Sequence, residues 1–192
     1  MQATIRLPVP GIERARWIEV GQGDIARARA DAIVTSANEF LAGGSGVDEA
    51  IRLAAGPAVD DEIARRDLRC PTGQAVITGP GELESRGVRW IVHAVGPVWE
   101  GGNHGELEAL RAAYRSAISV ADGVGAKTIA VPAISCGAFG FPAGVAATIA
   151  LDATRDGLAE ASSLECVEFV LMDPDVFSVF RREAGRRVRL EG

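Results

Sequence analysis

Two glycine-rich segments of the sequence have the residue types that bind anions. The first lies in TSANEFLAGGSGVDEAIRLAAG (35–56), where GGSG (43–46) precedes a helix-like segment with Asp48 near its start. Glycine lets backbone N–H groups approach an oxyanion closely, and a helix N-terminus adds positive partial charge. The segment therefore indicates either a plain turn or a cradle for a phosphate group with a carboxylate beside it.

The second segment, VPAISCGAFGFPAGVAATIA (131–150), repeats this arrangement. An apolar strand leads into a loop that holds Gly137 and Gly140, and a helix-like stretch follows. Neither segment matches the GxGxxG fingerprint or a P-loop, so either loop alone is more typical of a simple turn. Two such loops together suggest a ligand with two phosphates.

Polar side chains near these loops have structural as well as chemical interpretations. Asp48 would stabilise a helix start, but beside an anion site it would also be suited to orient a water. Asn38 and Asp24 fit turn positions. His93 lies inside an apolar strand and is interpreted as a core histidine. Cys136 adjoins the second loop but has no basic neighbour in the sequence that would favour a thiolate.

Strand-like and helix-like segments alternate along the chain, which predicts an α/β fold. We expect strands at 16–20, 31–37, 74–78, 89–95, 127–134 and 167–172, and helices at 47–55, 58–69, 104–121, 143–161 and after 173. The expected architecture is a three-layer α/β/α sandwich with a mixed, largely parallel central sheet. Ligands of such sheets bind beyond the carboxyl ends of the strands, where the glycine clusters fall. We expect an N-terminal arm (1–15), one domain (16–188) and a short tail (189–192).

Composition excludes several classes of function. The chain has 192 residues, 47% of them hydrophobic and 24% charged, which are globular values. A net charge of −6 argues against nonspecific binding to nucleic acid or anionic membranes. Three scattered cysteines and two histidines argue against a zinc site or a disulfide framework. Without a signal peptide or membrane span in the sequence, we expect a cytoplasmic monomer with no metal and no cofactor.

Seven segments, in this order and spacing, resemble the macro domain family and within it the MacroD-type branch. The resemblance runs from about Trp17 to Phe180. The segments are GDI (23–25), DAIVTSAN (31–38), GGSGVDEAI (43–51), AAGP (54–57), TGQAVIT (72–78), VHAVGPVWEGGNHGE (92–106) and PAISCGAFGFP (132–142).

The resemblance implies that the partners are ADP-ribose or mono-ADP-ribosylated proteins. For the MacroD-type branch it implies hydrolysis of mono-ADP-ribose from acidic side chains. Asp24 matches the residue that hydrogen-bonds the adenine amino group, assisted by the Ile25 amide. Asn38 matches the residue that holds the distal ribose. Asp48 matches the aspartate that orients the attacking water, a task in which the substrate diphosphate also takes part.

The same resemblance assigns the two diphosphate loops. The residues concerned are Gly44, Ser45, Gly46 and Val47 in the first loop, and Ser135, Cys136, Gly137, Ala138, Phe139 and Gly140 in the second. Phe139 takes the place of an aromatic ring against the distal ribose, and Met172 the place of a residue against adenine.

The sequence departs from the family pattern at a few positions. Thr35 replaces the first asparagine of NAAN, Ser45 replaces a glycine, Arg52 stands where histidine is common, Ala26 follows GDI, and Cys136 replaces a small residue or threonine. These departures put substrate preference and rate in question more than binding. Two alternatives stay open at this point: a noncatalytic ADP-ribose reader, and a deacetylase of O-acetyl-ADP-ribose.

Overall fold

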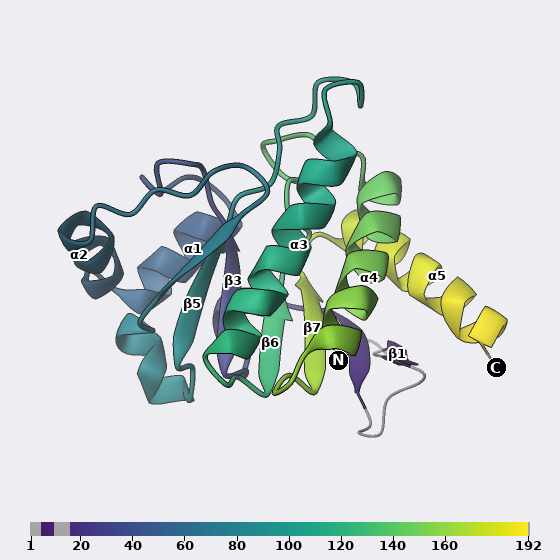
Figure 1. Ribbon diagram of the computed structural model, residues 1–192, viewed down its shortest axis with the longest axis horizontal. Coiled ribbons are helices and arrows are strands. Elements are labelled where there is room, and N and C mark those ends of the chain that lie inside the picture. Colours follow the sequence, from purple (N-terminus) through teal and green to yellow (C-terminus); the bar gives the residue numbers. More distant parts are fainter. Residues whose placement is uncertain (1–4, 10–15, 192) are drawn as a thin grey trace.

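The computed structural model describes residues 5–9 and 16–191, and a seven-stranded sheet lies at its centre (Figure 1). The strand order is β1-β2-β7-β6-β3-β5-β4. The four inner pairings are parallel, and the outer pairs β1/β2 and β4/β5 are antiparallel. The strands are β1 (Ile5–Pro8), β2 (Trp17–Gln22), β3 (Ala32–Ser36), β4 (Ala75–Thr78), β5 (Trp90–Ala94), β6 (Thr128–Val131) and β7 (Cys166–Leu171).

Helices cover both faces of the sheet, which confirms the three-layer sandwich. One face carries α3 (Glu106–Gly123), α4 (Ala143–Glu160) and α5 (Pro174–Glu191), and in Figure 1 α3 and α4 lie in front of the strands. The other face carries α1 (Val47–Ala55), α2 (Ala58–Arg65) and the short 3₁₀ helices η1 (Ile25–Arg27) and η2 (Gly81–Arg86). None of the helices in the described part of the chain is long and apolar enough to cross a membrane.

The central strand β3 shows why the apolar runs become buried strands. Ala32 and Val34 pack into the core under α3, α4 and α5, while Ile33 packs into the core under α1 and α2. Successive side chains of a strand point to opposite faces, so a strand covered on both sides is apolar throughout. The sheet thus separates two hydrophobic cores.

Four predicted boundaries are wrong. The strand expected over 127–134 spans only Thr128–Val131. Residues 5–8 were expected in an arm, but they form the edge strand β1, whose Leu7 is buried against the α5 side of the sheet. Residues 1–4 and 10–15 of that arm lie outside the described residues. Helix α2 ends at Arg65 rather than at 69, because Asp67 has a left-handed backbone (φ 45°). Helix α5 runs to Glu191, into the segment expected as a tail.

Strands β3, β6 and β7 are parallel neighbours, so their carboxyl ends open at the same edge of the sheet. The segment after β3 leads to α1, and the segment after β6 leads to α4. Tyr114 of α3 fixes the start of the latter: its buried hydroxyl donates to the Pro132 carbonyl (3.1 Å) and accepts from the Ile134 N–H (2.9 Å).

Replacing Tyr114 by phenylalanine should destabilise the fold. The variant would remove one hydrogen bond from the Ile134 N–H and one from the Pro132 carbonyl, which would keep only the bond between them (3.0 Å). Each bond lost costs about 0.5–1.5 kcal/mol. Urea unfolding of Tyr114→Phe measures this loss, with Ser119→Ala, an exposed hydroxyl on the same helix, as the control. Equal stability of wild type and Tyr114→Phe would contradict the prediction.

Candidate functional site

A cleft at the carboxyl ends of the strands consists of two adjoining cavities. The first, of about 430 Å³, is called the apolar lobe, and the second, of about 200 Å³, the polar lobe. Gly46, Val47, Ala133 and Gly137 line both cavities, so the two glycine-rich loops meet where the lobes join. The two cavities therefore form one continuous cleft that passes between the loops.

All but one of the residues predicted for the site line this cleft. The apolar lobe receives Asp24, Ile25, Gly46, Val47, Cys136, Gly137 and Met172. The polar lobe receives Asn38, Gly44, Ser45, Gly46, Val47, Asp48, Ser135, Gly137, Ala138 and Phe139. Gly140 lines neither lobe; its left-handed backbone (φ 66°) closes the turn of the second loop.

Sequence reasoning missed several wall residues. They are Gly23, Ala50, Pro132, Ala133, Val170, Leu171, Asp173 and Val176 in the apolar lobe, and Ser36 and Ala37 in the polar lobe. Most of them are small or apolar. They lie at or after the end of a strand, or on a helix that borders the cleft. Only their position at the sheet edge, and no chemical signature, could have indicated them.

The first loop ends at Gly46, which occupies the N-cap position of α1. Its backbone has a conformation that other residues rarely adopt (φ 67°, ψ −123°). A Cβ at this position would meet no neighbouring atom, so backbone conformation rather than space requires the glycine. Gly46 supplies no side-chain acceptor to the first turn of α1. Amides at such an uncapped helix start are ready to bind an anion.

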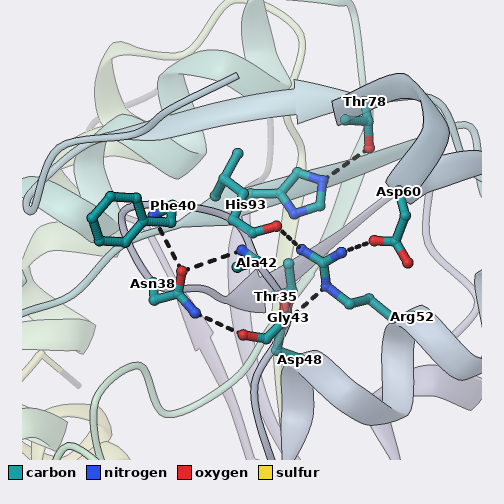
Figure 2. Close-up of polar contacts among 11 residues, drawn as sticks. Thr35, Asn38, Phe40, Ala42, Gly43, Asp48, Arg52, Asp60, Thr78 and His93 are labelled. Atoms are coloured by element: carbon teal, nitrogen blue, oxygen red, sulfur yellow. Dashed lines mark hydrogen bonds and ion pairs between the residues drawn. The ribbon is translucent and has the colours of Figure 1, made fainter. Parts of the chain in front are cut away.

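Asn38 braces the first loop from within. Its Nδ2 donates to the Gly43 carbonyl (2.7 Å), and its Oδ1 accepts from the N–H groups of Phe40 (3.1 Å) and Ala42 (3.3 Å) (Figure 2). The side chain also lines the polar lobe. Both ends of the carboxamide thus shape the loop, which sequence reasoning expected of a turn asparagine.

Asp48 is buried, with only 2% of its surface exposed, yet it lines the polar lobe. The Thr35 hydroxyl donates to its Oδ1 (2.7 Å), and the Arg52 Nε donates to its Oδ2 (2.9 Å) (Figure 2). A carboxylate has about four acceptor positions, so these two bonds leave room for a water. The geometry is that of a fixed carboxylate at the end of the cleft.

The second loop is braced by the segment that follows β5. Ser135 is buried in a left-handed conformation (φ 65°), and a Cβ on Gly96 would lie only 2.2 Å from its hydroxyl oxygen. The Trp99 N–H donates to the Phe139 carbonyl (2.9 Å), and the Trp99 ring packs on Phe141 at 4.7 Å between centroids. The position of Phe139 in the polar lobe therefore depends on Trp99.

The apolar lobe combines apolar walls with one carboxylate. Asp24 caps η1 by accepting a hydrogen bond from the Ala26 N–H (3.0 Å), and Ile25, Val170 and Leu171 form apolar surface beside it. Met172 lies at the lobe with 71% of its surface exposed. This surface suits a flat apolar ring whose edge carries a hydrogen-bond donor.

Two other titratable groups are unsuited to chemistry in the cleft. His93 is completely buried and shares a hydrogen bond with the Thr78 hydroxyl (2.9 Å), so it is the core histidine predicted from the sequence. Burial, together with the charge of Arg52, lowers the pKa of His93 to about 4. Burial raises the pKa of the Cys136 thiol to about 12, so no thiolate forms near neutral pH. Among the described residues, no three acidic, histidine or cysteine side chains cluster as metal ligands.

Glu106 organises the segment that carries Trp99. Its carboxylate accepts hydrogen bonds from the N–H groups of Glu100 (3.1 Å), Gly102 (2.9 Å) and His104 (2.6 Å). Burial alone would raise the pKa of Glu106, but the backbone donors outweigh it and lower the pKa from 4.5 to about 2. The ionised form is therefore the one that holds this loop.

The pKa of Glu106 predicts how stability depends on pH. Because folding lowers this pKa, the carboxylate stabilises the native state fully above about pH 4.5, and the contribution disappears as pH falls through about 2. Urea unfolding of wild type and Glu106→Gln across this range should give a gap in stability that is constant near neutral pH and shrinks in acid. A gap that does not change with pH would contradict the prediction.

Comparisons of the sequence with known proteins find relatives of one kind. The family model of the Macro domain matches residues 34–150. A macro domain-containing protein of Caldanaerobacter subterraneus subsp. tengcongensis is 46% identical over 86% of this chain and 94% of its own length. An O-acetyl-ADP-ribose deacetylase of Salmonella gallinarum is 43% identical over 86% of this chain and 92% of its own.

Solved structures show the same likeness. The Oceanobacillus iheyensis macrodomain with ADP superimposes with a TM-score of 0.83 at 30% identity, over 97% of each chain. The Trypanosoma brucei macrodomain in complex with ADP-ribose gives a TM-score of 0.79 at 34% identity, over 88% of this chain and 69% of that one.

Proposed function

The chain belongs to the macro domain family, and from this premise we propose that it binds ADP-ribose and hydrolyses mono-ADP-ribose from acidic side chains of proteins. The observation that carries the proposal is the fixed Asp48 carboxylate, which lines the polar lobe beside two amide-rich loops. A carboxylate beside anion-binding loops repels a bound anion, and a role of Asp48 in the reaction would account for its presence there.

The two lobes fit the two halves of ADP-ribose. The adenosine moiety occupies the apolar lobe, where Asp24 accepts a hydrogen bond from the adenine amino group and Met172 covers the ring. The diphosphate crosses the junction at Gly46 and Gly137. The distal ribose enters the polar lobe, beside Phe139. Backbone amides and the start of α1 supply the positive potential, which is consistent with anion binding by a chain of net charge −6.

Hydrolysis of the ester requires a water held near the distal ribose. Asp48 accepts a hydrogen bond from this water and receives its proton as the water oxygen attacks the ester. The attack is at the acyl carbon, and the bond between that carbon and the ribose oxygen breaks. The proton passes from Asp48 to the leaving ribose oxygen, so the products are ADP-ribose and the free carboxylic acid of the protein. The main contribution of the chain is position, since the two loops hold the diphosphate and with it the scissile bond.

O-acetyl-ADP-ribose is the second candidate substrate, because the Salmonella gallinarum relative bears the name of its deacetylase. Both substrates carry an acyl ester on the distal ribose, and their acyl groups differ: an acetyl group in one and a protein side chain in the other. The same lobes and the same Asp48 therefore serve both reactions, and the two proposals differ in whether a protein chain is tolerated at the polar lobe.

Replacing Asp48 should separate binding from turnover. Asp48→Ala should release ADP-ribose from a glutamate-modified protein at least about 100-fold more slowly, the usual contribution of a positioned base. Its affinity for free ADP-ribose, measured by calorimetry, should change only a few-fold. Asp61→Ala, an exposed acidic residue of α2, is the matched control. Full activity of Asp48→Ala would overturn the assigned role, and a wild type that binds without turnover would be a noncatalytic reader.

A linkage-resolved assay decides between the two substrates. Wild type is given a protein with glutamate-linked ADP-ribose and, separately, O-acetyl-ADP-ribose, and kcat/KM is measured for each. We expect hydrolysis of both, with the protein substrate preferred. Activity on the acetyl ester alone would restrict the function to deacetylation. Two further properties stay predictions. Cell fractionation tests the cytoplasmic location, and size-exclusion chromatography tests the monomeric state.

A further inference from the structure

The guanidinium group of Arg52 makes three contacts, and each of them reaches a different segment of the chain. Nε donates to Asp48 one turn earlier on α1, and Nη1 pairs with Asp60 of α2 (Figure 2). Nη2 donates to the Leu41 carbonyl (2.8 Å). The side chain is only 12% exposed. Because the guanidinium is planar and rigid, fixing three of its sides leaves it one orientation.

Asp48 is held from two directions as a result. Thr35 reaches Oδ1 from the central strand β3, and Arg52 reaches Oδ2 from within α1. Thr35 is fully buried and shows no exposed surface. One carboxylate oxygen is thus fixed to the sheet and the other to the helix, which sets the plane of the carboxylate at the polar lobe.

Neither Thr35 nor Arg52 is among the described residues that line the two lobes. Each of the three guanidinium nitrogens of Arg52 already has a protein partner. A direct contact of either residue with the substrate therefore does not follow from the geometry. Any effect on the reaction has to pass through Asp48, or through the loop that contains Leu41 and Asn38.

We infer that Thr35 and Arg52 are positioning residues for the hydrolysis, which together aim the Asp48 carboxylate at the attacking water. The inference rests on the proposed function, since it names what sets the geometry of the same carboxylate. Arg52 has a second effect through the Leu41 carbonyl. Leu41 has a left-handed backbone (φ 50°) within the loop that Asn38 braces, so Arg52 joins the aspartate and this loop in one network.

Paired variants test the inference. Thr35→Val removes the hydroxyl at nearly constant shape, and Arg52→Gln removes the charged fork. Both should lower kcat by about 10–100-fold, the effect of a small misplacement of a reacting group, with ADP-ribose affinity nearly unchanged. Thr35→Ser keeps the hydroxyl and should retain activity. Arg52→Lys keeps one charge-assisted bond to Asp48 and should lie between wild type and Arg52→Gln.

Arg115→Gln is the control for loss of an arginine ion pair, because Arg115 pairs with Glu160 on the α3 and α4 side of the sheet. Its kcat should equal that of wild type. Thermal unfolding is measured for every variant. If Arg52→Gln does not fold, the Thr35→Val and Thr35→Ser pair together with Arg52→Lys decide the question.

A double-mutant cycle separates positioning from an independent role. In an Asp48→Asn background, Arg52→Gln should cause no further loss of kcat, because both changes act on one group. A full additional loss, or a rise in KM and ADP-ribose Kd without a change in kcat, would overturn the inference.

Crystal structures of Thr35→Val and Arg52→Gln complete the test independently of activity. The Asp48 carboxylate should rotate away from its wild-type orientation in each variant. An unchanged orientation in both would overturn the inference, even if the wild-type protein hydrolyses both esters. A wild type that hydrolyses neither ester would instead refute the proposed function, and the orientation of Asp48 would still decide whether Thr35 and Arg52 position it.

Discussion

The parallel pairing of β3, β6 and β7 is the constraint on which the site depends. Their register places Ala32 opposite Ile129 and Val131 opposite Phe169, so the three strands end close together at one edge of the sheet. Each strand then releases its chain into a loop at that edge. The two glycine-rich loops are far apart in the sequence. They meet at this edge because hydrogen bonding between β3 and β6 places the ends of the two strands side by side.

The second constraint is electrostatic. In the proposed function, the cleft attracts a dianionic diphosphate while it keeps a buried aspartate nearby. Backbone amides at the start of α1 attract the anion, and no lysine or arginine is among the described residues that line the lobes. Arg52 balances the negative charge of Asp48 from outside the lobes. A buried carboxylate without such a partner would strongly destabilise the fold. The arginine therefore serves stability and geometry at once.

Most of the fold was predictable because its strands are apolar on both faces and its helices have regular spacing. The failures occur where a pattern is short or depends on distant contacts. Strand β1 has four residues, of which only Leu7 is buried, so the apolar pattern is too short to predict a strand. Its pairing with β2 is what makes this segment a strand. The end of α2 depends on the left-handed Asp67, a conformation that no spacing of apolar residues indicates.

The two loops of the site could be predicted from the sequence, but not all the hydrogen bonds that hold the Asp48 carboxylate could be. Glycine clusters after buried strands indicated both loops, and the family resemblance named Asp48. The spacing of Asp48 and Arg52, four residues apart, is typical of an ion pair on a helix and could have indicated their contact. The bond from Thr35 could not be foreseen, because it joins a strand to a helix across a loop whose path only the structure gives.

In the sequence, Thr35 and Arg52 are two separate departures from the family pattern. The structure places them on the two oxygens of one carboxylate, so they form a single feature. A buried carboxylate needs a donor on each oxygen, and a hydroxyl from the strand and a guanidinium from the helix satisfy that need here. What the chemistry requires at this position is a direction for the carboxylate rather than a particular pair of residues. In the proposed reaction, different donor pairs therefore serve equally well if they give the Asp48 carboxylate the same direction.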